Sequence, residues 1–183
     1  MLKQHKNGCP SDWIVKWAPL IIEKGKVLDI ACGSGRHSVF LANAGHFVTA
    51  LDKDVSRLPH DPQIKAIKSN LEDLSAWPLV GKKFNGIIVT NFLYRPLFPV
   101  ISRSLLPGGV LIYETFGIGN ESYGRPRSKR FLLQPGELLE AFSREFVIIA
   151  YENGIRSVPS PAVIQRIIAI RKSKNYKLIR LPN

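Results

Sequence analysis

The chain has 183 residues, 45% of them hydrophobic, which is enough to bury most of its apolar surface in one core. Its 26 Lys and Arg outnumber its 14 Asp and Glu and give a formal net charge of +12. Such a charge is typical either of a protein that binds a polyanion or of one whose basic surface is simply solvated. No apolar run approaches the roughly 20 residues that span a bilayer, and no apolar segment follows the basic N-terminus, so we expect a cytoplasmic protein without a secretory signal or membrane partner.

The first predicted element is a short helix over residues 12–17, with Ser11 as its N-cap and Pro19 at its end. Trp13 and Trp17 are four residues apart and therefore share one face of this helix. Two interpretations remain open: the helix packs on the sheet edge, or it folds as a lid over a bound ligand.

A strand over residues 26–30 comes next and contains Asp29 near its end. A turn with Gly33 and Gly35 follows, and then a helix over residues 36–44. Such a helix directs its free N–H groups and its positive dipole end at whatever lies over the turn.

Two ligand classes bind a turn of this kind, dinucleotides and S-adenosylmethionine. The dinucleotide pattern requires a third glycine where this chain has Ser38. Asp29 would repel a pyrophosphate, whereas it would attract the ammonium and sulfonium charges of S-adenosylmethionine. The turn therefore favours S-adenosylmethionine, and a dinucleotide oxidoreductase is a distant alternative.

The remaining elements alternate strand and helix, which predicts a doubly wound, mostly parallel sheet. The link over residues 152–162 is too short for a helical crossover, so the last two strands should be antiparallel neighbours. The predicted strands are 47–51, 64–68, 84–90, 110–114, 146–151 and 163–170, and the predicted helices are 96–106 and 135–142.

The pattern Asp29-x-x-x-Gly33-x-Gly35 resembles motif I of the class I S-adenosylmethionine-dependent methyltransferases. Residues 91–98, 113–116 and 124–127 are similar to a compact bacterial branch of tellurite-resistance-type methyltransferases. The resemblance, which covers about residues 11 to 171, implies an α/β Rossmann-like fold with a seven-stranded sheet and one antiparallel strand. It also implies a single methyltransferase domain over residues 1–183, with an N-terminal helix or lid at 1–25 and a basic tail at 172–183.

The cofactor residues follow the ends of parallel strands, where open α/β sheets bind their ligands. Asp52 lies 17 residues after Gly35, near the spacing at which a carboxylate accepts from ribose hydroxyls. The resemblance implies that Asn70 and the backbone of Leu71 hold adenine, although Asn70 could instead cap a helix. The full expected set is Asp29, Ala31, Gly33, Gly35, Asp52, Asn70, Leu71 and Asn91.

For the chemistry, the candidates are Asn91 and Tyr94 after the fourth strand and Glu114 at the end of the fifth. Glu114 would act as a general base or only as a scaffold, since positioning alone can suffice for transfer from a sulfonium. His37, at the start of a helix, is expected to point to solvent or along the helix flank. The expected substrate-binding residues are Arg95, Tyr123, Arg125 and Arg127.

The sequence therefore predicts a methyltransferase that uses S-adenosylmethionine and acts on a small anionic acceptor, with no metal, because its His and Cys residues are scattered. An RNA acceptor is the first alternative, and a noncatalytic module that binds S-adenosylmethionine or nucleic acid is the second. The RNA alternative depends on two basic clusters, one at Arg125, Arg127, Lys129 and Arg130, and one at Arg171, Lys172, Lys174, Lys177 and Arg180.

Overall fold

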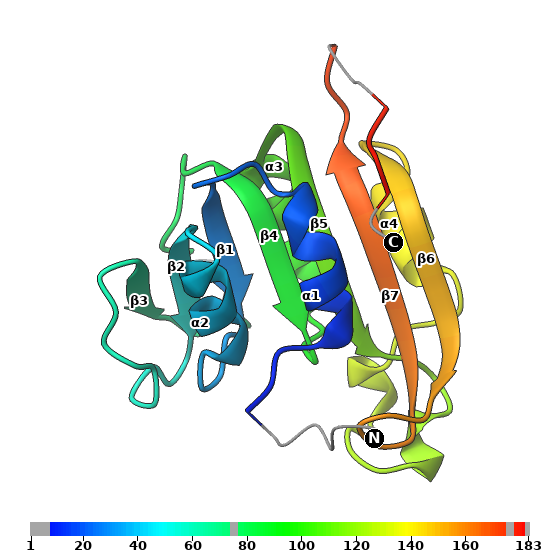
Figure 1. Cartoon of the computed structure of the whole chain (residues 1–183). Coiled ribbons are helices and arrows are strands. Elements are labelled where there is room, and N and C mark those ends of the chain that lie inside the picture. The colour runs from blue at the N-terminus through cyan, green and yellow to red at the C-terminus, as the bar shows by residue number, and fades with distance from the viewer. Residues whose placement is uncertain (1–7, 74–76, 175–177, 182–183) are drawn as a thin grey trace, which may run out of the picture.

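The computed structural model describes residues 8–73, 77–174 and 178–181, and its centre is a seven-stranded sheet (Figure 1). The strand order is β3-β2-β1-β4-β5-β7-β6. The first five strands pair in parallel, whereas β7 runs antiparallel to both of its neighbours, as predicted. The strands are β1 (Lys26–Ile30), β2 (Phe47–Asp52), β3 (Ile64–Lys68), β4 (Phe84–Thr90), β5 (Leu105–Phe116), β6 (Phe146–Arg156) and β7 (Ala162–Arg171).

Helices cover both faces of this sheet, with α1 and α2 on one face and α3 and α4 on the other (Figure 1). Successive residues of the buried strands point to opposite faces: Val27 packs under α1, and Leu28 packs with α3 and α4. The helices are α1 (Asp12–Trp17), α2 (Arg36–Asn43), α3 (Phe98–Ser104) and α4 (Glu137–Phe142), with short 3-10 turns at Ala18–Leu20, Arg95–Leu97, Asn120–Ser122 and Lys129–Phe131.

The N-terminal helix is part of the core. Trp13 and Trp17 are 4% and 5% exposed, and their rings meet edge to face with centroids 5.6 Å apart. Ser11 caps the helix as predicted, because its Oγ accepts the Trp13 N–H at 3.2 Å. Both tryptophan rings therefore belong to the packed layer on this face of the sheet.

Several element boundaries differ from the prediction. The helix predicted over 96–106 ends at Ser104, and β5 begins at Leu105 rather than at Val110. Leu105 pairs with Phe84 before the register shifts to Gly86 and Val110, so the Pro-Gly-Gly sequence forms an irregularity inside the strand. The last two strands are also longer than predicted, because their hairpin pairs out to Arg156 and Ala162.

The described residues contain no helix that is both long and apolar enough to cross a bilayer.

Candidate functional site

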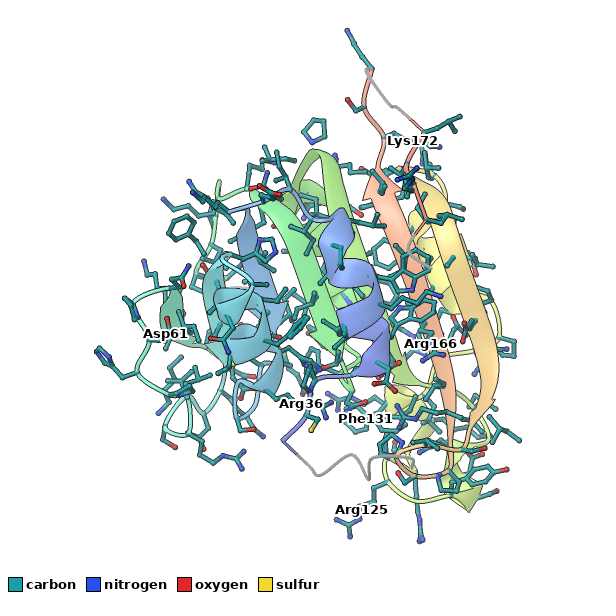
Figure 2. The ribbon with its side chains drawn as sticks, in the orientation of Figure 1. Arg36, Asp61, Arg125, Phe131, Arg166 and Lys172 are labelled. Carbon is teal, nitrogen blue, oxygen red and sulfur yellow. The ribbon has the colours of Figure 1, made fainter. Side chains whose placement is uncertain are left out.

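Two cavities open at the edge of the sheet where β1, β2, β4 and β5 end. The first has a volume of about 710 Å³ and the second about 600 Å³. Asn91 and Phe116 line both, so the cavities adjoin at the ends of β4 and β5. Figure 2 shows Arg36, Phe131 and Arg125 toward this end of the sheet and Lys172 toward the opposite end.

The first cavity brings together five of the eight residues that the sequence suggested for a cofactor: Ala31, Asp52, Asn70, Leu71 and Asn91. Asp52 Oδ2 accepts the Gly33 N–H at 2.8 Å, which fixes the carboxylate beside the glycine turn. Asn70 Oδ1 accepts the Glu72 N–H at 3.1 Å, so Asn70 holds the local turn while its side chain lies at the cavity wall.

Three residues in the turn after β1 have a left-handed backbone conformation. Ala31, Gly33 and Gly35 have φ values of 57°, 56° and 81°. A Cβ added to Gly33 would meet nothing within 4 Å, whereas one added to Gly35 would lie 2.3 Å from Leu58 Cδ2. Gly35 therefore makes close packing possible, and Gly33 leaves open space over the turn.

Asp29 lies beneath this turn and is fully buried. Its Oδ2 accepts a 2.6 Å hydrogen bond from Ser38 Oγ, while Oδ1 has no hydrogen-bond partner among the described residues. Burial raises the pKa of Asp29 to about 7. The carboxyl lines neither cavity, so any ligand that it attracts must reach it through the turn or through water.

The second cavity is rich in arginine. Arg36, Arg125, Arg156 and Arg166 line it, together with Glu114 at the end of β5. Glu114 is 2% exposed and pairs with Arg166 Nη1 at 3.1 Å and with Arg156 Nη1 at 3.5 Å. Even with these ion pairs, the cavity keeps an excess of positive charge.

Among the other predicted residues, Tyr123 and Arg125 line the second cavity, and Arg127 does not. The ring of Tyr94 packs against the core and lies in neither cavity. Arg95 is held by Glu137 at 2.5 Å and donates to the carbonyl oxygens of Arg130 and Leu132 at 2.9 Å. The structure thus places Arg95 in a contact that joins two loops, outside both cavities.

His37 differs from the expectation that it points to solvent or along the helix flank. It is 1% exposed, its Nε2 accepts the Ser11 N–H at 3.1 Å, and its Nδ1 lies 3.2 Å from Thr90 Oγ1. Burial lowers the pKa of His37 to about 3. The side chain therefore points inward, toward Ser11 and Thr90.

Sequence reasoning missed Ser11, Arg36, Arg156 and Arg166 as site residues. One signal was present, since Arg166 interrupts an otherwise apolar strand and an unpaired charge is costly in such a position. Ser11 and Arg156 carry no local signal, because only the tertiary fold brings the N-terminal segment and the β6–β7 hairpin to this edge.

The comparison with protein families finds a match to the family "Tellurite resistance protein TehB" over residues 4–85, a little under half of the chain. Among curated proteins, the chain is 29% identical over 79 residues to an uncharacterized RNA methyltransferase of Protochlamydia amoebophila, covering 38% of this chain and 18% of the relative. It is 26% identical over 125 residues to the putative methyltransferase YqeM of Bacillus subtilis, covering 59% of this chain and 49% of the relative. The chain therefore spans less than half the length of either.

Among solved structures, TehB from Haemophilus influenzae superposes with a TM-score of 0.70 at 19% identity, over 92% of this chain and 64% of that one. An S-adenosylmethionine-dependent methyltransferase from Mesorhizobium loti superposes with a TM-score of 0.66 at 16% identity, over 85% of this chain and 97% of that one. At these identities the superpositions establish the Rossmann-like fold that the sequence predicted. The chain thus resembles the TehB family in sequence over residues 4–85 and S-adenosylmethionine-dependent methyltransferases in fold.

Proposed function

We propose that this chain, which resembles the class I S-adenosylmethionine-dependent methyltransferases and TehB among them, transfers the methyl group of S-adenosylmethionine to a small anionic acceptor. The observation that carries the proposal is the pair of adjoining cavities, one lined by the predicted cofactor residues and the other by four arginines. Their shared wall at Asn91 is where the reacting methyl would lie. The two free thiols, Cys9 and Cys32, are consistent with a cytoplasmic protein.

In this proposal the first cavity holds the adenosine half of the cofactor. Asp52 would accept from the ribose hydroxyls, and its position is supported by the fixed contact with the Gly33 N–H. Asn70 and Leu71 line the same cavity and would hold adenine. The apolar surface that a base needs comes from Phe92, Leu93 and Phe131.

The residues present fit a cationic amino-acid cofactor. Asp29 leaves one buried carboxylate oxygen without a donor, and the turn above it is open at Gly33. A cofactor ammonium would supply the missing positive partner and stabilise the ionised carboxylate. When bound, S-adenosylmethionine supplies an activated methyl group on a sulfonium, so the chain needs only to hold and orient the two reactants.

The second cavity is the proposed acceptor site. Arg36, Arg125, Arg156 and Arg166 give it an excess of positive charge that favours an anionic molecule. Glu114 has two arginine partners and one serine donor, so we propose that it orients those arginines and does not act as a general base. In-line transfer then follows from placing the acceptor atom opposite the sulfonium, across the wall at Asn91.

The test of the cofactor assignment is calorimetry with S-adenosylhomocysteine. Asp52→Ala should weaken binding by roughly 1–3 kcal/mol, the scale of a lost hydrogen bond to a charged group. Asp61→Ala, in the loop before β3 and outside both cavities, is the matched control and should bind as the wild type does. Equal affinity in the wild type and the Asp52 variant would remove the first cavity from the proposal.

The test of the reaction uses tritiated S-adenosylmethionine and fractionated cell extract. The wild type should label a small, acidic molecule. Arg125→Ala should lower the labelling rate without changing cofactor affinity, whereas Arg127→Ala, which removes an exposed arginine outside the cavity, should leave the rate unchanged. Equal effects of the two substitutions would show that the second cavity is not the acceptor site.

An RNA acceptor is favoured less by the geometry. One curated relative is named an RNA methyltransferase, at 29% identity over 38% of this chain. However, many exposed cations lie at the opposite edge of the sheet, among them Lys26 at the start of β1 and Lys24, Lys82 and Lys83 before β1 and β4. An RNA held there would be separated from Asn91 by the length of a strand, about 20 Å for six residues.

A further inference from the structure

The segment that precedes α1 joins the two sides of the candidate site. We call residues 9–12 the strap, and all four line the second cavity. At one side of the cavity, Arg36 Nη1 donates to the Cys9 carbonyl oxygen at 3.3 Å, and the Ser11 N–H donates to His37 Nε2 at 3.1 Å. At the other side, Ser11 Oγ donates to Glu114 Oε1 at 3.1 Å. The strap therefore connects the start of α2 with the end of β5.

The His37 ring has one arrangement that satisfies both of its neighbours. Because Nε2 accepts from Ser11, the proton of the neutral ring lies on Nδ1 and is donated to Thr90 Oγ1 at 3.2 Å. Since burial lowers the pKa of His37 to about 3, Nε2 keeps its lone pair at neutral pH. His37 is thus a permanent acceptor beneath the strap.

Ser11 is the junction of a closed set of contacts. Its Oγ accepts the Trp13 N–H while its hydroxyl proton goes to Glu114. Glu114 in turn pairs with Arg166 through Nη1, while Nε and Nη2 of the same guanidinium donate to Glu152 at 2.8 and 2.5 Å. The Arg166 guanidinium also lies 4.4 Å from the centroid of the Trp13 ring. Because Trp13 belongs to α1, these contacts link the strap, Glu114 and Arg166. A shift of the strap would therefore move Glu114 and its arginine partners together.

We propose that His37 and Ser11 are positioning residues: His37 holds the strap through the Ser11 N–H, and Ser11 holds Glu114, which orients Arg156 and Arg166 in the second cavity. The role at the acceptor site depends on the function proposed above. Neither residue touches the reacting atoms in this account. Each acts through Glu114 and its arginines.

The first experiment needs no substrate. Long-range ¹H–¹⁵N spectra of the labelled protein should show His37 as the neutral Nδ1–H tautomer from pH 8 to pH 5. The Ser11 amide should exchange slowly with solvent in the wild type and in His37→Gln, whose side-chain oxygen can still accept, and rapidly in His37→Leu. An Nε2–H tautomer, titration of His37 near its ordinary pKa of 6.5, or a Ser11 amide that is unaffected by His37→Leu would overturn the role of His37.

The second experiment uses inorganic sulfate as an anion probe at low ionic strength and S-adenosylhomocysteine as the probe of the first cavity, both by calorimetry. Ser11→Ala and His37→Leu should weaken sulfate binding about tenfold and change S-adenosylhomocysteine binding less than about twofold. Ser11→Thr, which keeps the hydroxyl and the helix cap, and His37→Gln should restore sulfate binding. If His37→Leu fails to fold, the Ser11 pair gives the same comparison.

The two calorimetric probes distinguish failure of the anionic acceptor site from failure of the positioning role of Ser11 and His37. Wild-type protein that binds S-adenosylhomocysteine but no sulfate contradicts the anionic acceptor, and the amide exchange of Ser11 then decides whether His37 holds the strap. Wild-type protein that binds sulfate equally well after Ser11→Ala contradicts the positioning role and leaves the acceptor site standing.

Discussion

At the scale of single residues, two buried titratable side chains respond to pH in opposite directions. Asp29 has its pKa raised to about 7, and His37 has its pKa lowered to about 3, both mainly by burial. In each case the folded protein favours the neutral form, because a charge away from water is costly. Asp29 therefore lowers the free energy of unfolding as the pH rises, and His37 lowers it as the pH falls.

The first residue-scale prediction concerns Asp29→Asn. The folded pKa lies above the unfolded value of 3.8, so the contribution of Asp29 is fully present below about pH 4 and is lost as the pH rises through about 7. The variant stays neutral and should exceed the wild-type free energy of unfolding at pH 8 by up to about 4 kcal/mol, with little difference near pH 4. Urea titrations at pH 4, 6 and 8 measure this, and a difference that is constant with pH would contradict it.

The second residue-scale prediction concerns His37→Gln. The folded pKa lies below the unfolded value of 6.5, so the contribution of neutral His37 is fully present above that pH and is lost as the pH falls toward 3. Between pH 6.5 and 4 the variant should therefore lose less stability than the wild type does. His60→Gln, which changes an exposed histidine, is the control and should follow the wild-type pH curve.

At the scale of elements, the N-terminal helix is a short piece whose stability comes from packing. Its six residues are too few to be helical alone, and the buried face with Trp13, Ile14 and Trp17 holds it on the sheet. The same face places Ser11 over the second cavity. The packing of α1 therefore helps to form the wall of the second cavity.

The packing of α1 can be measured with one pair of variants. Trp17→Ala should cost about 3–5 kcal/mol of unfolding free energy, because the side chain is 5% exposed and leaves a cavity. Val15→Ala, on the opposite face and 41% exposed, should cost less than about 0.5 kcal/mol. Chemical denaturation of both checks the contrast, and similar losses would mean that α1 is not docked in this way.

The glycine turn is the second element with a direct test. Gly33→Ala should cost about 1–2 kcal/mol of stability because the residue has a φ of 56°, yet no neighbour blocks the added methyl group. If a cofactor lies over the turn, the same variant should lose S-adenosylhomocysteine affinity by more than its stability loss explains. Gly45→Ala, also at positive φ with open space and far from both cavities, separates backbone strain from cofactor contact.

At the scale of the whole molecule, the two edges of the sheet at which strands begin and end differ in their charged residues. The edge where β1, β4 and β5 end mixes arginines with Asp52 and Glu114. The opposite edge, where β7 ends beside the start of β5, is dominated by exposed lysines and arginines. These cations are Lys24, Lys26, Lys82, Lys83, Arg103, Arg144, Lys172 and Lys174, and Figure 2 marks Lys172 at that edge.

This separation leads to a prediction about nucleic acid. Any tRNA retained on filters at low salt should lose affinity steeply as salt rises and should depend on Lys82 and Lys83, as phosphate contacts do. Lys82→Glu with Lys83→Glu should reduce retention without changing the rate of methyl transfer to the small acceptor. Methyl transfer to tRNA that the wild type performs and this double variant loses would instead support RNA as the acceptor.

The sequence by itself determined the fold class and predicted much of the lining of the first cavity, because these signals are local. Hydrophobic runs predicted β1, β3 and β4 with their bounds, and Asp29, Gly33 and Gly35 marked the turn. Strand ends meet at one edge of any parallel sheet, so Asp52, Asn70 and Asn91 were expected to share a cavity wall before a structure was known. The site roles of these residues stay predictions until binding is measured.

Only the tertiary structure decided the lining of the second cavity, the proposed acceptor site. Ser11, Glu114 and Arg166 are separated by more than fifty residues at each step, and no periodic pattern links them. Pairing of β5 with β7 and docking of α1 bring them within hydrogen-bond reach, and burial between those layers turns His37 inward and keeps it neutral. The charge and shape of the second cavity depend on contacts between residues far apart in the chain. No local sequence pattern could predict them, because folding alone brings these residues together.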